Sequence, residues 1–291
     1  MSGPAQVDER DRRGLEDPRR LRVHRPPAER DVPFVPTDDA VVPAILRLAS
    51  VGSGDVLYDL GCGDGRIVIA AARQLSASGV GVDIDPLRIQ ECREAARRAR
   101  VGDRVRFVQA SLFDVDLRPA TVVTLYLLPS LNIRLRPKLL TELRPGARVI
   151  SNHFDMADWR PDEVAHAHHR TLYRWIVPAW VAGEWHCTIN DPAGRRRIVL
   201  NLERRYQIVT GTALVGGRPA LIGEGRIHGD MLTFRLVEWG RGGAIMRYRA
   251  HVEGSQLRGA CWEDGDDAHP VEWGGVRAQA TSIAPRDPSP A

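Results

Sequence analysis

Lysine is almost missing from this chain. Of the 41 residues that are lysine or arginine, only Lys138 is a lysine. The arginines are spread along the whole sequence, and the net charge at pH 7 is only +4. A nucleic-acid binding surface would need basic residues gathered on one face. We therefore expect no nucleic-acid partner.

Long apolar runs and paired cysteines are missing too. No stretch reaches the length of about 18 apolar residues that a membrane-spanning helix needs, so no transmembrane segment is expected. The cysteines are far apart and form neither a C-x-x-C motif nor a metal-ligand spacing; they are Cys62, Cys92, Cys187 and Cys261. This usage predicts a reducing compartment, the cytoplasm, and no metal site.

Three histidines stand close together, at His166, His168 and His169. Alternation along a strand would put His166 and His168 on one face, but no acidic or thiol partner has a matching spacing. We interpret this group as a solvated strand face and not as a metal site.

The two ends of the chain lack an apolar pattern. Residues 1–30 hold eight arginines, six acidic residues and four prolines, which predicts a disordered tail. The segment has no apolar core of a signal peptide, and its acids count against a transit peptide. A second disordered tail is expected at residues 280–291.

A strand, a glycine-rich turn and a helix follow one another at residues 56–72. The strand pattern ends at Asp59 and Leu60, Gly61-Cys62-Gly63-Asp64-Gly65 forms the turn, and a helix pattern begins at Arg66. Glycines lack the Cβ atoms that would keep a ligand from the backbone, and the helix start offers free N–H groups. The spacing differs from the dinucleotide motif G-x-G-x-x-G. Asp59 would repel a pyrophosphate, but it suits a ligand that carries an amino group and a sulfonium. An ordinary glycine-rich turn is the alternative interpretation.

A second acidic residue ends the next predicted strand, Gly79-Val80-Gly81-Val82-Asp83. In nucleotide-binding α/β units an acid at this point accepts hydrogen bonds from the ribose hydroxyls. Asp83 is therefore the predicted ribose ligand, with a capping role as the alternative. Asp85 is predicted to cap the helix that begins at Pro86.

Residues 59–65 resemble the first motif of class I S-adenosylmethionine (SAM) dependent methyltransferases, E/D-x-G-x-G-x-G. The resemblance implies an α/β fold with a seven-stranded Rossmann-like sheet, and SAM as the cofactor. It also implies a cofactor site made by Asp59, Gly61, Cys62, Gly63, Asp83, Ile84, Ser111 and Leu112.

The adenine contact departs from the family pattern. Many members of this superfamily carry an aspartate where Ser111 stands, after the strand predicted at residues 104–110. Either the Ser111 hydroxyl and the Leu112 backbone hold the adenine, or Asp114 replaces the missing acid.

Residues 121–129 are predicted to form the fourth strand and its exit, where ligands of open α/β sheets lie. Methyltransferases of nucleic-acid bases usually carry N/D-P-P-Y/F here, whereas this chain has Thr124-Leu125-Tyr126-Leu127, which argues against base methylation. Tyr126 is the first candidate to orient the nucleophile, with core packing as the alternative. Asn152 and His153, at the end of the fifth strand, are further catalytic candidates. His153 would be a general base if the acceptor were a hydroxyl; a surface position is its alternative.

Four segments indicate a smaller group within this superfamily; they are residues 34–37, 41–46, 59–68 and 143–151. Together they are similar to the protein lysine methyltransferases that modify the mitochondrial ATP synthase c subunit and adenine nucleotide translocase, and to bacterial relatives of these enzymes. The resemblance covers residues 31–178. It implies a protein lysine as acceptor and places residues 34–37 near the active site, although Thr37 could instead cap the first helix.

Short alternating segments separated by turn signals follow Trp185; examples are residues 197–202, 206–210, 231–236 and 244–250. A meander of about eight strands would close into an up-and-down barrel, loosely similar to lipocalins. We therefore predict a methyltransferase domain at 31–178 and a barrel domain at 179–279. The barrel could be a filled lid or dimerisation element, or it could hold a ligand, and a homodimer is left open.

Three functions are compatible with these features. The first is SAM-dependent methylation of a protein lysine side chain. The second is O- or N-methylation of a small molecule, with the barrel shaping the acceptor pocket. The third is SAM or lipid binding without catalysis. Tryptophans at 175, 180 and 185 are expected to cluster at the junction and to fix the barrel as one wall of the acceptor cleft.

Overall fold

The computed structural model describes residues 35–191, 194–238 and 244–278. The two predicted tails and Phe34 lie outside the described residues. None of the helices in the described ranges is long and apolar enough to cross a membrane.

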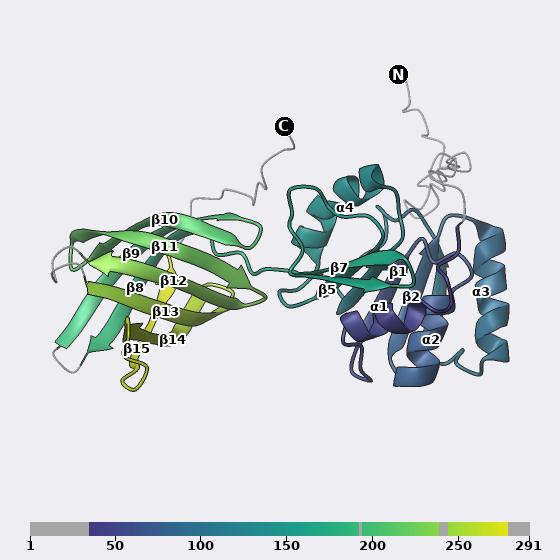
Figure 1. The fold of residues 1–291 in the computed structure, drawn as a ribbon, viewed down its shortest axis with the longest axis horizontal. Helices are drawn as coiled ribbons and strands as arrows, with labels where there is room; N and C mark the ends of the chain where they lie inside the picture. The colour runs from purple at the N-terminus through teal and green to yellow at the C-terminus, as the bar shows by residue number, and fades with distance from the viewer. Residues whose placement is uncertain (1–34, 192–193, 239–243, 279–291) are drawn as a thin grey trace, which may run out of the picture. The chain divides into compact units, whose positions relative to one another are not determined.

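The first half of the described chain forms a seven-stranded sheet in the order β3-β2-β1-β4-β5-β7-β6 (Figure 1). Its first five strands run parallel; they are β1 (Val56–Leu60), β2 (Ser78–Asp83), β3 (Val105–Gln109), β4 (Val122–Leu125) and β5 (Arg148–Asn152). The last two form a hairpin of β6 (Glu163–Ala167) and β7 (Arg170–Ile176), and β7 runs antiparallel to β5. This is the predicted Rossmann-like arrangement of class I methyltransferases.

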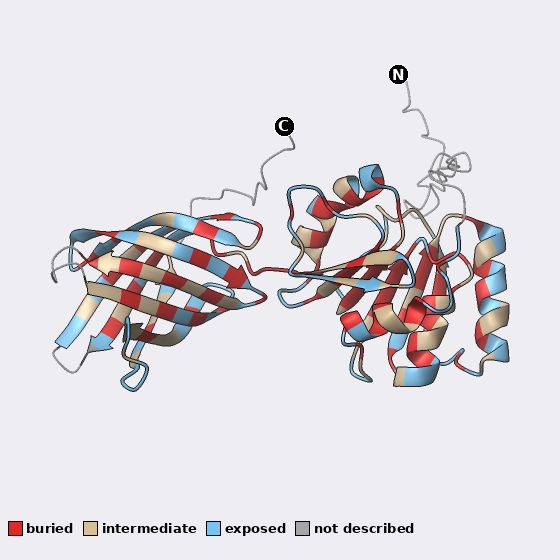
Figure 2. Ribbon diagram, viewed as in Figure 1, coloured by how far each residue is buried: buried red, intermediate tan, exposed pale blue. Residues whose placement is uncertain are grey.

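Helices cover both faces of this sheet because its strands are apolar on both sides, as a parallel sheet requires. The helices α1 (Val42–Leu48), α2 (Arg66–Leu75) and α3 (Pro86–Arg98) share a core with strand residues such as Leu57 and Ile150. The helix α4 (Pro129–Glu142) packs on the opposite face, against residues such as Val149. Red buried positions run along all the central strands in Figure 2.

The helix starts test two sequence predictions. Asp85 caps α3 as predicted, since its carboxylate accepts a hydrogen bond from the Leu87 N–H at 3.0 Å and Pro86 occupies the first turn. The alternative role of Thr37 as a helix cap is wrong. The N-cap of α1 is Val41, without a side-chain cap, and the buried Thr37 hydroxyl instead contacts Asn152.

The second half of the described chain forms a closed antiparallel barrel of eight strands, as predicted. They are β8 (Gly183–Asp191), β9 (Gly194–Arg205), β10 (Ile208–Val215), β11 (Arg218–His228), β12 (Met231–Glu238), β13 (Ala244–Glu253), β14 (Gln256–Glu263) and β15 (Val271–Arg277). Strand β15 pairs with β8, which closes the barrel and removes sheet edges. The domain boundaries at 178/179 and 279 stay predictions.

Aromatic side chains fill the middle of the barrel. Phe234 and Tyr248 stack with ring centroids 4.8 Å apart, and Trp273 meets both rings edge-on. Trp185 is fully buried in this same core, whereas Trp175 is fully buried in the core of the sheet. The predicted single cluster of Trp175, Trp180 and Trp185 is therefore wrong, because the two fully buried rings belong to different cores.

Candidate functional site

The glycine-rich turn between β1 and α2 has the left-handed backbone that its sequence predicts. Gly61, Gly63 and Gly65 have φ angles of 82°, 54° and 78°. The N–H groups of Gly61 and Cys62 donate to the Val82 carbonyl, at 2.8 and 3.0 Å, and so tie the turn to the end of β2. A Cβ at Gly65 would lie 2.8 Å from the Phe107 ring, so only glycine fits there.

Asp83 lies beside this turn with its carboxylate held in place. One oxygen accepts the Gly63 N–H and the other accepts the Asp85 N–H, both at 3.0 Å. A carboxylate oxygen accepts more than one hydrogen bond, and Asp83 is only partly buried. Its oxygens are therefore suited to accept two ribose hydroxyls. Ile84 follows it and is also partly buried, and its contact with the cofactor stays a prediction. The turn and Asp83 together fit the nucleoside part of SAM.

Asp59 is buried beneath the turn and is only 4% exposed. It accepts a hydrogen bond from the Thr124 hydroxyl at 2.7 Å. Burial raises the pKa of Asp59 from 3.8 to about 7; the Thr124 hydrogen bond opposes this rise, and the charges of Asp83 and Asp64 add to it. Asp59 therefore links β1 to β4 under the site and stays largely protonated below pH 7. Its contact with the cofactor stays a prediction.

Cys62 contributes backbone and packing to the turn. Its thiol lies 4.0 Å from the Cys92 thiol, which donates to the Gly63 carbonyl at 3.1 Å. The hydrogen bond with Cys92 and burial together raise the pKa of the Cys62 thiol well above its ordinary value. A thiolate is therefore disfavoured at Cys62.

The predicted adenine contacts lie after β3. The Ser111 hydroxyl accepts the Phe113 N–H at 3.3 Å, and its carbonyl accepts the Asp114 N–H at 3.0 Å. Ser111 and Leu112 are partly buried, whereas Asp114 is exposed. The Ala110 N–H donates to the Asp83 carbonyl, which joins this loop to the predicted ribose ligand. Ser111 shapes the loop, and both alternatives for the adenine contact stay predictions.

The catalytic candidates lie at the C-terminal ends of neighbouring strands of the sheet. Tyr126 follows β4, and Asn152 is the last residue of β5. Leu125 pairs with Ser151, so the next residues, Tyr126 and Asn152, stand side by side where the two strands end. Asn152 is 2% exposed; its amide N–H donates to the Thr37 hydroxyl at 3.4 Å, and its Oδ1 has no partner among the described residues.

His153 and Phe154 continue this edge. His153 is exposed and has a φ angle of 78°, which is uncommon for a residue other than glycine. Its ring meets Phe154 edge-on at 4.7 Å, and Phe154 stacks with Tyr126 at 6.5 Å. The structure therefore places Tyr126, Asn152 and His153 at the ends of neighbouring strands, with Phe154 beside them, and their catalytic roles stay predictions.

Sequence reasoning missed two arginines of this region. Arg66, directly after the glycine-rich turn, forms ion pairs with Asp64 and Asp39 at 2.5 and 2.8 Å and donates to the Thr37 carbonyl. It thereby fastens the segment before α1 to the turn. Arg170 lies with its guanidinium 5.5 Å from the centre of the Tyr126 ring. Nothing local marks Arg170, because only the antiparallel pairing of β7 brings it to this edge.

The three histidines near residue 168 lie on the β6–β7 hairpin. His166 is on β6, whereas His168 and His169 form the two-residue turn with φ angles of 46° and 64°. The expected strand face shared by His166 and His168 is therefore wrong, since the chain turns at His168. Within the described ranges, no group of three or more histidine, cysteine, aspartate or glutamate side chains could hold a metal.

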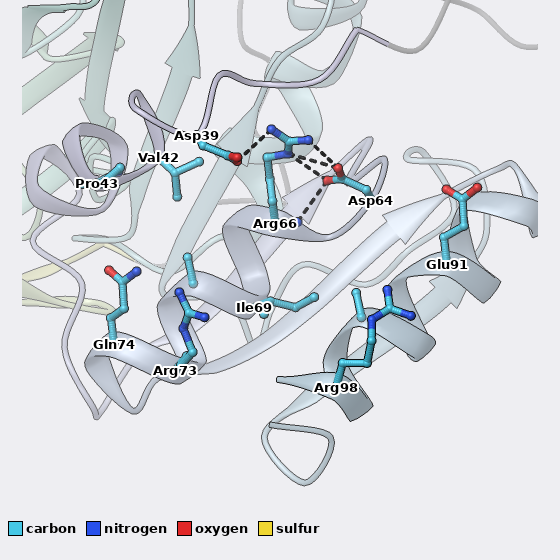
Figure 3. Close-up of a pocket in the computed structure, with 12 residues that line it drawn as sticks. Asp39, Val42, Pro43, Asp64, Arg66, Ile69, Arg73, Gln74, Glu91 and Arg98 are labelled. Atoms are coloured by element: carbon cyan, nitrogen blue, oxygen red, sulfur yellow. Dashed lines mark hydrogen bonds and ion pairs between the residues drawn. The ribbon is translucent and has the colours of Figure 1, made fainter. Parts of the chain in front are cut away.

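A groove of about 690 Å³ runs along the outer side of α1, α2 and α3 (Figure 3). Half of its lining residues are charged; they are Asp39, Asp64, Arg66, Arg73, Glu91 and Arg98. None of the predicted cofactor or catalytic residues lines it, so we do not assign the reaction to this groove. It meets the site only through Arg66 and its two acidic partners.

Known methyltransferases are similar in sequence to part of this chain. Residues 59–163 match the sequence profile of the ANTKMT methyltransferase domain. A protein-lysine N-methyltransferase of Saccharolobus islandicus is 42% identical over 151 residues, which cover 50% of this chain and 94% of that protein. The adenine nucleotide translocase lysine N-methyltransferase of Mus musculus is 35% identical over 137 residues; the match covers 47% of this chain and 59% of the mouse protein.

A solved structure agrees with these relatives on the fold. The crystal structure of an RNA methyltransferase from Salinibacter ruber, in complex with S-adenosylhomocysteine, is 52% identical with a TM-score of 0.50. That match covers 50% of this chain and 96% of the Salinibacter protein. Half of this chain thus corresponds to nearly the whole length of the archaeal and the Salinibacter proteins.

Proposed function

Because this chain belongs to the family of SAM-dependent methyltransferases that includes the archaeal protein-lysine N-methyltransferase, we propose that it methylates the side-chain amine of lysine in a protein. The chain is a SAM-dependent methyltransferase. Its acceptor is the part that we propose.

The observation that carries the proposal is the acceptor edge, which we define as Tyr126, Asn152, His153, Phe154 and Arg170. The buried Oδ1 of Asn152 has no partner in the described chain, so it can accept an N–H from an incoming amine. The rings of Tyr126 and Phe154 stack at 6.5 Å beside it and offer apolar walls for the four methylenes of a lysine. An acceptor oxygen without a hydrogen-bond donor, next to stacked rings, suits a long side chain that ends in an amine.

Methyl transfer requires that the amine be aligned with the methyl group and that water be excluded from both. When bound, SAM supplies a methyl group already activated by the sulfonium. The amine must arrive neutral, because its lone pair forms the new carbon–nitrogen bond while the electrons of the carbon–sulfur bond return to sulfur. Asn152 can fix the direction of the amine, and the rings can keep water away. Asp83 and the glycine-rich turn would hold the nucleoside so that the methyl group faces this edge.

RNA is the second candidate acceptor, because the Salinibacter structure is that of an RNA methyltransferase. Thr124-Leu125-Tyr126-Leu127 in place of N/D-P-P-Y/F disfavours a base as acceptor. The lysine proposal is also supported by the names of the archaeal and mouse relatives. A small-molecule acceptor and a role without catalysis stay as alternatives that the same experiment separates.

The experiment uses a variant enzyme without lysine. Lys138, the only lysine, forms an ion pair with Glu142 at 2.6 Å, and Lys138→Arg keeps that charge. This variant is incubated with SAM carrying a labelled methyl group and with a cell lysate divided into protein, RNA and small-molecule fractions. We expect label in protein, recovered after acid hydrolysis as methyl-lysine, none of which can come from the enzyme. Label confined to RNA or to small molecules would contradict the proposal.

Asn152→Ala then tests the acceptor edge itself. The variant should lose at least tenfold in kcat, because a buried hydrogen bond to the reacting amine is removed. Asn201→Ala is the matched control, since Asn201 is exposed on the barrel strand β9. Equal kcat values for the two variants would remove Asn152 from the proposal.

The compartment and the assembly complete the proposal. The four cysteines are free and buried, which supports a reducing compartment such as the cytoplasm. A lysine acceptor requires no contact with nucleic acid, and a measurement of mass in solution would decide between a monomer and a homodimer.

A further inference from the structure

Arg170 brings a positive charge to the acceptor edge through the topology of the sheet. Strand β7 runs antiparallel to β5, so its first residues lie where β5 ends. Leu172 pairs with Asn152, and the His153 N–H donates to the Thr171 carbonyl at 2.7 Å. Arg170 shares the strand face of Leu172, two residues away. The Cζ of Arg170 therefore reaches the Tyr126 ring, 5.5 Å from its centre.

The charge of Arg170 is not neutralised by an acid within the described ranges. The other partly buried or buried arginines of the sheet domain have carboxylate partners: Arg66 pairs with Asp64, Arg88 with Glu91, Arg136 with Asp158, Arg148 with Asp55, and Arg174 with Glu163. Arg174 lies on the same strand, four residues from Arg170. In contrast, Arg170 contacts the face of an aromatic ring, which attracts the cation and leaves its charge in place.

The backbone holds this cation at the edge. His168 and His169 form a two-residue turn with positive φ angles, which is the geometry of a tight hairpin. Ala167 pairs with Arg170 directly after this turn, so Arg170 is the first paired residue of β7. A cation at a hairpin base has less freedom than one at a loop tip.

We propose that Arg170 lowers the pKa of the acceptor amine and thereby delivers it in the neutral, nucleophilic form. The inference rests on the proposed lysine acceptor. It assigns Arg170 as a positioning residue that sets the protonation state of the acceptor amine. A nearby positive charge disfavours the ammonium form. The ammonium group then gives its proton to water before the nitrogen attacks the methyl carbon. A unit charge about 10 Å away, at an effective dielectric constant of about 20, shifts a pKa by about one unit.

Other ionisable groups lie around the acceptor edge, and their effects on the pH profile must be distinguished from the effect of Arg170. Burial raises the pKa of Asp59 to about 7, so this carboxyl gains its negative charge within the pH range of the assay. The titratable groups on the elements around this edge are Asp59 in β1, Tyr126 after β4, His153 after β5, Asp38 and Asp39 before α1, and His166, His168 and His169 on the hairpin of Arg170 itself.

The test is the pH dependence of kcat at saturating SAM, with a peptide that carries the lysine methylated in the lysate experiment. Arg170→Gln should raise the apparent pKa of kcat by about one unit, so that kcat falls about tenfold at pH 7 and approaches the native value above pH 10. KM for the peptide should fall, because an ammonium group is no longer repelled. Arg170→Lys should restore the native profile.

Arg106→Gln is the matched control, since Arg106 is exposed on β3, at the far edge of the sheet from β6 and β7. Its profile should overlay that of the native enzyme. A profile of Arg170→Gln that overlays the native one, or a kcat lowered by the same factor at every pH, would overturn the proposal, since the second result is that of packing alone. Failure of the proposed function is distinguishable, because the native enzyme would then form no methyl-lysine.

Discussion

Asp59→Asn should stabilise the sheet domain, and the gain should grow with pH. Asp59 is 4% exposed, and burial raises its pKa from 3.8 to about 7. An acid with a raised pKa contributes its full stability below its unfolded pKa and loses it as the pH rises through the folded pKa. The shift of about three units corresponds to about 4 kcal/mol at about 1.4 kcal/mol per unit. Asparagine carries no charge and can still accept the Thr124 hydroxyl.

The assay is urea unfolding without SAM, followed by the far-ultraviolet helix signal. All four helices of the described chain belong to the sheet domain, so this signal reports on that domain and not on the barrel. We expect Asp59→Asn to be more stable than the native chain by about 2 kcal/mol at pH 5 and about 4 kcal/mol at pH 8. Asp103→Asn, at an exposed turn position, is the control and should change stability little. An equal gain at both pH values, or no gain at pH 8, would refute the reasoning.

Three further predictions follow from the cofactor site and the barrel. Asp83→Ala should weaken the binding of S-adenosylhomocysteine about tenfold or more in calorimetry. Asp85→Ala, in contrast, should cost about 1 kcal/mol of stability and leave binding within about twofold. Normal binding by Asp83→Ala would show that Asp83 does not bind the ribose. Gly65→Ala should lower the free energy of unfolding by about 2–4 kcal/mol in urea, because its φ angle is 78° and its Cβ would meet the Phe107 ring at 2.8 Å; unchanged stability would contradict the tight turn. Deleting residues 183–291 should leave binding of S-adenosylhomocysteine within a few-fold in calorimetry but abolish transfer to the native acceptor; transfer at the full rate would show that the barrel does not select the acceptor.

The sequence predicts the two folds because their patterns are local. The glycine-rich turn needs positive φ angles at three positions, and glycine supplies them at fixed spacing from Asp59 and Asp83. The alternation of apolar residues in 197–202 and 231–236 likewise marks strands of a barrel. The cap at Asp85 follows the same logic, since a side chain that bonds a backbone group two residues away depends on neighbours in the sequence.

Thr37 and Trp185 show where local patterns fail. Thr37 has the residue type of a cap and precedes a helix, yet α1 begins later and its hydroxyl meets Asn152 across the fold. Trp175 and Trp185 are close in sequence but belong to the cores of the sheet and the barrel. Sequence proximity cannot reveal such partners, because they are chosen by packing between distant segments.

The sequence alone predicts the proposed cofactor site, since the glycine-rich turn and Asp83 lie at the ends of neighbouring strands whose spacing is regular. The proposed acceptor edge depends on the tertiary structure. Tyr126 follows β4, Asn152 ends β5 and Arg170 begins β7, and the antiparallel insertion of β7 beside β5 brings the cation of Arg170 to the Tyr126 ring. Sheet order and strand direction are set by how the whole apolar surface is buried, so a residue far along the chain acquires its neighbours only when the sheet is complete.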